Sequence, residues 1–215
     1  MTSPPVMLAY SYQGPYQNGI QRRLCRTPCG NRSHARNAET VTELRTDRLE
    51  LRRWREDDLD AYAAIVADRE VGRHLGGPQN RATAWRQIAI FMGHREMRGW
   101  TSAPVVERAT GRLVGRAGLW RPEGWPGVEM GWIFARDTWG LGYATEVGVA
   151  MRDYAFGELG IPHLVSLIAP DNTASIRVAV KIGSAFEGQH DLNGSPHLIY
   201  GQEASQHSPR GSPPR

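Results

Sequence analysis

Cysteine and long apolar runs are both scarce in this 215-residue sequence. Its two cysteines, Cys25 and Cys29, exclude a disulfide framework. A metal site would need more ligands than these two and His34, so we expect no metal. No apolar run approaches the roughly 18 residues that a membrane helix needs. The N-terminus also lacks a basic leader before an apolar stretch, so we expect a cytoplasmic protein without a membrane partner.

Acidic residues are absent from both ends of the chain. Residues 1–38 hold five arginines and residues 204–215 hold two, but neither segment contains Asp or Glu. Of the 26 basic residues, 19 therefore remain in 39–203 against all 22 acidic residues, a net charge of −3. A nucleic-acid-binding domain usually carries its basic excess on the folded part. The whole-chain charge of +4 therefore does not indicate a nucleic-acid partner.

The same two ends lack hydrophobic periodicity. They are rich in Pro, Gly, Ser, Gln and Asn, and cannot bury enough apolar surface to offset the entropy of ordering. We expect disordered tails at 1–38 and 204–215. A chain of this length suffices for one buried core and is short for two, so we expect a single domain over 39–203.

Regular patterns begin near residue 42. Leu49 and Leu51 alternate with charged residues, as in a half-buried strand, and Asp57 or Asp58 can cap a following helix. Apolar residues at helical spacing predict this helix and a second one: Leu59, Tyr62, Ala63 and Val66 in the first, and Trp85, Ile88, Ala89 and Met92 in the second. Three strands with short connections follow, at 101–108, 113–120 and 128–134, and should pair antiparallel.

The last third of the chain predicts a helix after residue 142, a strand at 163–169, a helix ended by Gly183, and a hairpin around the turn "LNGS". The order is therefore strand, two helices, three strands, helix, strand, helix and hairpin. This order predicts an α+β fold with a mixed, mostly antiparallel sheet flanked by about four helices.

The stretch "WGLGYATEV", residues 139–147, places two glycines where a strand gives way to a helix. The first turn of a helix leaves N–H groups unpaired, and glycine removes side chains that would hold a phosphate away. A tight turn that merely requires glycine is the alternative. Neither G-x-G-x-x-G nor G-K-[ST] is completed, and a nucleotide-binding βαβ fold would not begin with a meander.

Three motifs in one order resemble a known family. They are "LRTDRLELRRWREDDLDAYAAI", "VEMGWIFARDTWGLGYATEV" and "LIAPDNTASIRVAVKIG". The sequence resembles the GNAT superfamily of acyl-CoA-dependent N-acetyltransferases, in particular its RimJ/RimL branch of ribosomal-protein alanine acetyltransferases. The resemblance covers roughly residues 41–201 and implies acetyl-CoA as cosubstrate.

The resemblance also implies a cofactor site. The family loop R/Q-x-x-G-x-G/A binds pyrophosphate through backbone amides, and Asp137 stands where that loop begins with Arg or Gln, with Arg136 beside it. The preceding strand would pair its backbone with pantetheine. The cofactor residues implied are Ile133, Phe134, Ala135, Gly140, Leu141, Gly142, Tyr143, Ala144, Thr145 and Asn172.

Acetyl transfer needs an uncharged amine, donors for an oxyanion and a proton for the departing thiolate. The resemblance implies Glu129 as the base, acting through a water, and Ser175 as the group beside the thiolate. Each has a simpler interpretation: Glu129 as a solvent-facing strand residue, and Ser175 as a first-turn residue behind a helix cap at Asp171, Asn172 or Thr173. His94, Glu96 and Glu123 are weaker candidates for the base.

Two further expectations concern the tryptophans and the segment "KIGSAFEG". We expect three tryptophans in the core, Trp54, Trp85 and Trp132, and three lining an acceptor cleft, Trp100, Trp120 and Trp125. The segment "KIGSAFEG" departs from the family pattern, so we assign no site residue beyond Lys181.

The sequence thus predicts an acetyl-CoA-dependent N-acetyltransferase that acetylates a primary amine, either a protein N-terminus or a small molecule. Because neither cysteine lies near the site, we expect direct transfer in a ternary complex. The alternatives are a non-catalytic acyl-CoA sensor and a ribosome- or RNA-associated protein acting through its basic N-terminal tail. The resemblance leaves a homodimer open and identifies no interface.

Overall fold

The computed structural model describes residues 44–192 and 194–206. The predicted N-terminal tail and the three ligands considered for a metal, Cys25, Cys29 and His34, lie outside these residues. The first residues of the predicted C-terminal tail form a 3-10 helix, η2 (Ala204–Gln206), and the rest of that tail lies outside them.

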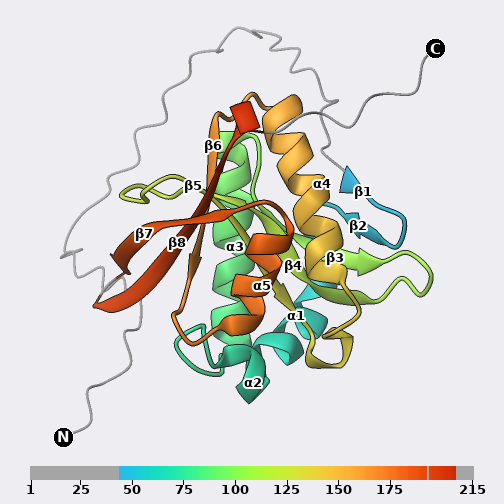
Figure 1. Ribbon diagram of the computed structural model, residues 1–215. Coiled ribbons are helices and arrows are strands. Elements are labelled where there is room, and N and C mark those ends of the chain that lie inside the picture. The colour runs from blue at the N-terminus through green and yellow to red at the C-terminus, as the bar shows by residue number, and fades with distance from the viewer. Residues whose placement is uncertain (1–43, 193, 207–215) are drawn as a thin grey trace, which may run out of the picture.

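One eight-stranded sheet organises the domain (Figure 1). Its strand order is β1-β2-β3-β4-β5-β6-β8-β7, and all neighbours are antiparallel except β5 and β6. The strands are β1 (Leu44–Arg45), β2 (Leu49–Leu51), β3 (Ser102–Glu107), β4 (Leu113–Trp120), β5 (Val128–Phe134), β6 (His163–Ile168), β7 (Ala185–Leu192) and β8 (Ser195–Glu203). The α+β class, the mixed sheet, the three-strand meander and the final hairpin are therefore confirmed.

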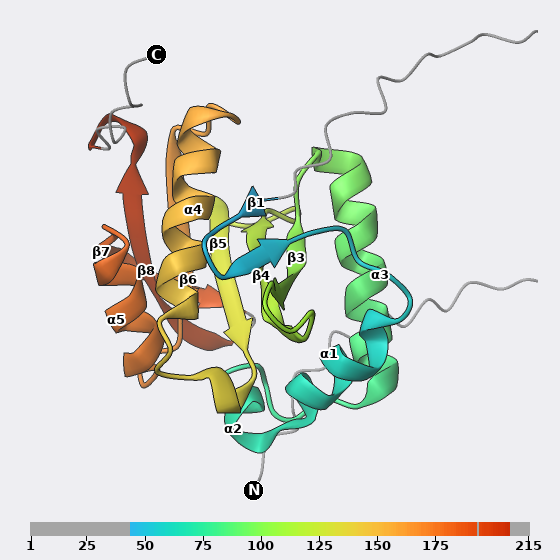
Figure 2. The ribbon, with the colours of Figure 1, turned by 90° about the vertical axis from the view of Figure 1, so that its right-hand side faces the viewer.

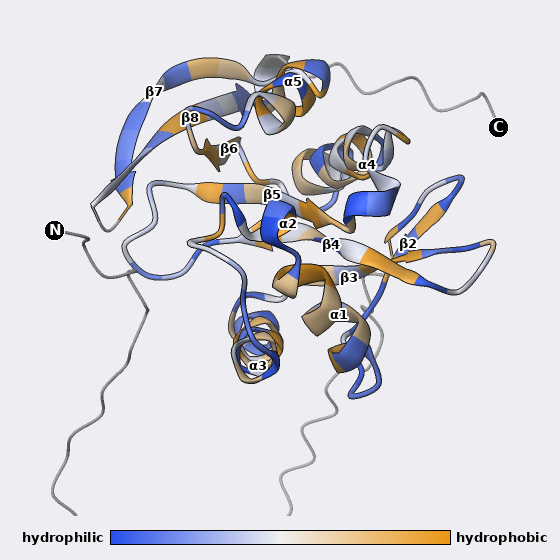
Figure 3. Ribbon diagram, turned by 90° about the horizontal axis from the view of Figure 1, so that it is seen from below, coloured by the Kyte–Doolittle hydropathy of each residue, from blue (hydrophilic) through white to orange (hydrophobic). Residues whose placement is uncertain are grey.

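Helices cover both faces of this sheet (Figure 3). One face carries α1 (Asp58–Ala67) and α3 (Arg81–Arg98), and the other carries α4 (Tyr143–Gly157) and α5 (Thr173–Lys181). Each face has its own apolar core. Met130, Val147 and Met151 belong to the core under α4, and Tyr62 and Phe91 belong to the core under α1 and α3. Among the helices in the described part of the chain, none combines the length and apolarity needed to cross a membrane.

The apolar face predicted for α1 is confirmed, because Tyr62, Ala63 and Val66 are buried and Leu59 packs beside them. The face predicted for α3 is wrong at three of its four residues, and only Ile88 is buried as predicted. The structure buries Ala84, Ile88, Phe91 and His94, whereas Trp85, Ala89 and Met92 are exposed. Apolar residues occupy both sides of this helix, so their spacing does not decide which side faces the sheet.

The same rotation of α3 overturns one expectation about the tryptophans. Trp85 is 59% exposed and does not belong to the core. Trp54 is buried between Tyr62 and Phe91, and Trp132 packs half-buried against the core under α4, as expected.

One short strand and one short α-helix were not predicted: β1 and the four-residue helix α2 (Arg69–Gly72). The Asp68 side chain caps α2 by accepting the N–H groups of Glu70 and Val71. Both elements are too short to show a hydrophobic period. Figure 2 shows α2 at the lower edge of the sheet, near the loop that joins β5 to α4.

Candidate active site

The two parallel strands at the centre of the sheet pair over a short distance only. Within the described chain, β5 and β6 are in register at Val128 with Leu164 and at Glu129 with Val165. Each strand continues well past this point, and the Ser166 hydroxyl donates to the Met130 carbonyl at 2.6 Å just beyond it. The β6-facing edge of the rest of β5 is therefore open to an extended ligand that pairs with its backbone.

A glycine turn joins the end of β5 to α4. After the 3-10 helix η1 (Arg136–Thr138), Gly140 and the N-cap residue Gly142 have φ values of +81° and +82°. Residues other than glycine rarely adopt this backbone conformation, so the turn requires both glycines. An ideal Cβ at Gly140 would meet no atom within 4 Å, and no side chain caps the first turn of α4. The required turn therefore also leaves backbone N–H groups open to an anion.

Arg48, from the turn between β1 and β2, contacts this glycine turn directly. Its Nη1 donates to the Leu141 carbonyl at 3.0 Å, its guanidinium pairs with Glu146 at 2.6 Å, and it lies 4.7 Å from the centre of the Tyr143 ring. Burial raises the pKa of Glu146, but hydrogen bonds from Thr46 and Arg48 outweigh it and hold that pKa below its ordinary value. No local pattern could have indicated Arg48, which is 93 residues from Leu141.

Asp137 occupies the position where the sequence motif departs from its family. Its carboxylate accepts from Arg112 Nη1 at 2.6 Å, and this bond lowers the pKa of Asp137. Arg112, directly before β4, therefore compensates the negative charge that replaces the motif's Arg or Gln.

The second helix N-terminus of the site follows β6. Asn172 is the N-cap of α5, and its Oδ1 accepts the Ser175 N–H at 3.1 Å, as the capping interpretation expected. Ser175 is half-buried in the first turn. Because β5 and β6 are parallel, α4 and α5 begin at the same edge of the sheet, where these strands end (Figure 1).

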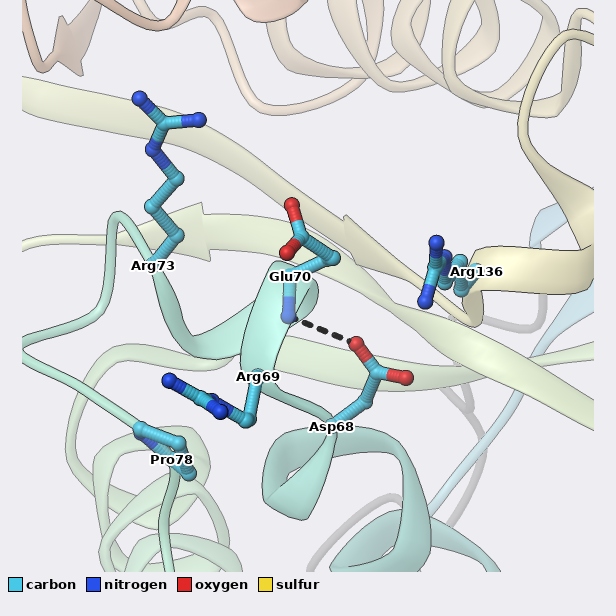
Figure 4. Close-up of a pocket in the computed structure, with 6 residues that line it drawn as sticks. All are labelled: Asp68, Arg69, Glu70, Arg73, Pro78 and Arg136. Atoms are coloured by element: carbon cyan, nitrogen blue, oxygen red, sulfur yellow. Dashed lines mark hydrogen bonds between the residues drawn. The ribbon is translucent and has the colours of Figure 1, made fainter.

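An arginine-lined cleft lies at this edge, beside α2 (Figure 4). Its volume is about 730 Å³, and it is lined by Asp68, Arg69, Glu70, Arg73, Pro78 and Arg136. Asp171, in the loop between β6 and α5, lies 3.5 Å from Arg73 and 3.3 Å from His74. The segment that carries α2 therefore lines a cleft together with η1 and also contacts the β6–α5 loop.

Glu129 lies at the end of the β5–β6 pairing. Its Oε2 accepts the Trp125 Nε1–H at 2.7 Å. Burial raises the pKa of Glu129, although the Trp125 bond and the nearby charges of Arg116 and His197 partly offset this rise. Glu129 is half-buried as a residue and its carboxyl is hydrogen-bonded, so the solvent-facing interpretation of Glu129 is wrong.

Gly131, two residues after Glu129 on the same face of β5, contributes no side chain. An ideal Cβ at Gly131 would have Glu129 Oε1 as its nearest neighbour, at 3.6 Å. Trp120 lies opposite Glu129 in the β4–β5 register. Two of the three tryptophans predicted to line an acceptor cleft, Trp120 and Trp125, are therefore beside Glu129. The Trp100 ring packs against the core under α4, and the Trp120 ring packs against Phe91 and His94 of α3.

A basic residue that the sequence analysis missed lies on the same face. Arg116 Nε donates to the Tyr62 hydroxyl at 3.0 Å, and its Nη1 donates to Ser102 Oγ at 2.9 Å. Its guanidinium also lies 4.9 Å from the centre of the Phe91 ring. Arg116 therefore places a fixed positive charge close enough to influence Glu129.

The three weaker candidates for a base lack comparable surroundings. His94 is buried, with Nδ1 bonded to the Trp100 carbonyl at 2.9 Å and Nε2 accepting the Arg121 N–H at 3.1 Å. Both ring nitrogens are occupied, so His94 cannot accept a proton from a substrate. Glu96 and Glu123 are exposed on α3 and on the β4–β5 loop.

His94 gives the fold a pH dependence. Burial lowers the pKa of His94 below the usual 6.5, so the unfolded chain binds its proton first as the pH falls. We therefore expect the protein to lose stability below pH 6.5. His94→Phe should lower the free energy of unfolding by about 2 kcal/mol, and with it the melting temperature, because it leaves the Trp100 carbonyl and the Arg121 N–H unpaired. Between pH 7.5 and 5.5 the variant should also lose less stability than the wild type. Equal losses of stability in thermal melts would contradict the assignment of this pH dependence to His94.

Among residues 44–192 and 194–206, no group of three or more His, Cys, Asp or Glu is arranged to hold a metal ion.

Comparison with known proteins identifies relatives of this domain. The family model described as "Acetyltransferase (GNAT) domain" matches residues 48–185. YkkB of Bacillus subtilis is 32% identical over 162 residues, which cover 74% of this chain and 94% of YkkB. YnaD of the same species, which is named as an N-acetyltransferase, is 27% identical over 145 residues, 67% of this chain and 84% of its own. A crystal structure of an acetyltransferase from Agrobacterium tumefaciens is 30% identical, covers 76% of this chain and 95% of its own, and has a TM-score of 0.70.

More distant structures share the fold alone. Two are titled ribosomal-protein acetyltransferases, from Vibrio cholerae and Vibrio fischeri, at 17% and 15% identity and TM-scores of 0.63 and 0.59. An aminoglycoside acetyltransferase in complex with coenzyme A is 19% identical with a TM-score of 0.62. The family expectation is therefore confirmed, whereas the RimJ/RimL branch has only this loose support.

Proposed function

Because this chain belongs to the acetyltransferase (GNAT) domain family, we propose that it transfers an acetyl group from acetyl-CoA to a primary amine. The observation that best supports this function is the separation of β5 from β6, with a glycine turn at its end and Glu129 at its start. An extended thioester and a base would meet there.

The cofactor lies along three parts of the site in this proposal. The amides of residues 140–145 bind the pyrophosphate at the positive end of the α4 dipole, where no side chain of the described residues caps the helix and the Leu141 N–H makes only a long bond of 3.4 Å to the Thr138 carbonyl. The backbone of Ile133, Phe134 and Ala135 pairs with the pantetheine arm at the open edge of β5. Asn172 contacts the same arm from the start of α5, where its side chain already caps the helix.

Glu129 acts as the base, through a water, and takes the proton that the acceptor amine must lose. The amine nitrogen then forms a bond to the acetyl carbon, and backbone N–H groups of β5 stabilise the oxyanion. The carbon–sulfur bond breaks next, and the thiolate, beside the Ser175 hydroxyl, takes up the second proton that the amine nitrogen loses and leaves as coenzyme A. The described domain contains no cysteine, which supports direct transfer without an acyl-cysteine.

The acceptor in this proposal is a protein N-terminal amine or a small amine. Both classes carry the primary amine that Glu129 requires. Trp120, Trp125 and the charge of Arg116 border the place where it would bind.

Calorimetric titration of the full chain with acetyl-CoA tests the first part of this proposal. We expect micromolar binding, followed by acceptor-dependent release of free thiol when a panel of small amines and N-terminal peptides is added. A chain that does not bind acetyl-CoA would overturn the proposal. Binding without thiol release across the panel would instead favour a non-catalytic sensor, and salt-sensitive RNA binding that needs residues 1–38 would favour the RNA-associated alternative.

Ser175→Ala tests the role proposed beside the thiolate. We expect kcat to fall about tenfold or more, with little change in the KM for acetyl-CoA, because the hydroxyl acts on the leaving group. Thr173→Ala is the matched control, since Thr173 is an exposed hydroxyl residue of the same helix turn. If the two variants show equal rates, Ser175 is only a first-turn residue.

A further inference from the structure

The outward face of α3 is apolar, although the helix already buries its opposite face against the sheet. Its large exposed apolar side chains are Trp85 at 59%, Ile90 at 55%, Met92 at 51% and Met97 at 83% exposure. In Figure 3, α3 forms the outside of its layer. A concentration of exposed apolar side chains on one helix is typical of an interaction surface.

Gly93 on the same face has no explanation within the residues of one copy that the structure describes. It lies inside the 18-residue helix, where glycine is less stable than alanine. Its φ is not positive, and an ideal Cβ would meet no atom within 4 Å. Neither backbone conformation nor packing requires this glycine. Close approach of a second backbone would require it, and Ala89, one turn earlier, is likewise small and exposed.

The charged residues of this face are arranged symmetrically about its small ones. Arg86 precedes residue 91 by five positions and Glu96 follows it by five, and both are exposed. Ala89 and Gly93 lie two positions on either side of the same point. All four follow one line along the helix, because their spacings of three and four residues match its turns.

We propose that α3 is a homodimer interface, in which it packs antiparallel against α3 of a second copy about a two-fold axis near residue 91. In this arrangement Ala89 lies level with Gly93 of the second copy, which lets the two helices approach closely. Arg86 lies level with Glu96 of the second copy, and symmetry forms this opposite-charge pair twice. Trp85, Ile90, Met92 and Met97 flank the contact along a helix about 27 Å long.

The face favours a second copy over an unrelated partner because it is complementary to itself. When the helix is reversed about its midpoint, small residues again lie where small residues were, and a positively charged side chain lies where a negatively charged one was. An isologous contact imposes this condition on a surface, whereas contact with a different protein does not.

Sedimentation velocity of the full chain tests the interface. We expect the mass to rise with concentration from 23.9 kDa toward twice that value. Arg86→Glu and Glu96→Arg should each weaken association about tenfold, because each places like charges opposite one another twice. The double variant should return to within about threefold of the wild type, since it restores both pairs. Glu158→Arg, at the end of α4 on the other side of the sheet, should change nothing.

Gly93→Arg gives a second measurement that does not depend on charge pairing. The space around Gly93 accepts a side chain, so the variant should keep its circular dichroism and thermal melt but lose association. A monomeric wild type at every concentration would overturn the proposal, as would a Gly93→Arg protein that still dimerises. A double charge variant no better than the single ones would overturn the antiparallel register. None of these outcomes depends on acetyl transfer.

Discussion

Glu129→Gln is expected to lower kcat by about 10²- to 10⁴-fold, the range typical of a lost general base. The substitution keeps the shape of the side chain and an oxygen that can accept the Trp125 N–H. It removes the group that can take a proton. The loss should therefore appear in kcat, and the affinity for acetyl-CoA measured by calorimetry should change little.

The pH profile separates this role from a structural one. Burial raises the pKa of Glu129 above the ordinary 4.5, and only the ionised carboxylate is a base. The rate of the wild type should therefore rise with pH through that raised pKa. This acidic limb should be absent from Glu129→Gln. Glu203→Gln, at an exposed position of β8, is the control and should keep both the rate and the limb.

Thermal stability should move in the opposite direction. A carboxyl with a raised folded-state pKa holds its proton more tightly when folded, so its contribution to stability is lost as the pH rises through that pKa. Glu129→Gln should therefore melt at a higher temperature than the wild type near pH 8. A variant that is less stable at this pH, with an unchanged rate, would show that Glu129 is a structural residue.

Gly142→Val is expected to weaken acetyl-CoA binding at least about a hundredfold, that is, by more than about 2.7 kcal/mol. Valine would have to adopt the φ of +82° found at the α4 N-cap, at a cost of about 1 to 2 kcal/mol. Its side chain would also enter the open space in front of the helix amides. The nearest atom to an ideal Cβ there is Arg48 Nη2 at 3.6 Å, so the protein itself could accommodate it.

Gly160→Val is the matched control for backbone strain. Gly160 lies beyond the other end of α4, with a φ of +63° and no atom within 4 Å of an ideal Cβ. Both variants should lose similar stability in thermal melts. Only Gly142→Val should lose acetyl-CoA binding in calorimetry. If the two bind equally well, the glycines at residues 140 and 142 serve the turn alone.

The local sequence was sufficient for much of the fold. The alternation at Leu49 and Leu51, the short turns of the β3–β5 meander and the apolar face of α1 are all patterns among residues close in the chain. The same holds for the α4 turn, because only glycine adopts the φ values found at residues 140 and 142. Asn172 as a helix cap was also predictable, since a cap bonds three residues ahead.

Tertiary structure decided what depends on distant parts of the chain. The face of α3 that enters the core depends on the sheet beneath it, because apolar residues line both sides of that helix. Arg48 at the glycine turn and Arg116 beside Glu129 act through partners between 14 and 98 residues away. The separation of β5 from β6 is likewise set by pairing between strands far apart in the chain. Local spacing therefore determined where the glycine turn and Glu129 lie in the sequence, and only long-range packing decided what surrounds them.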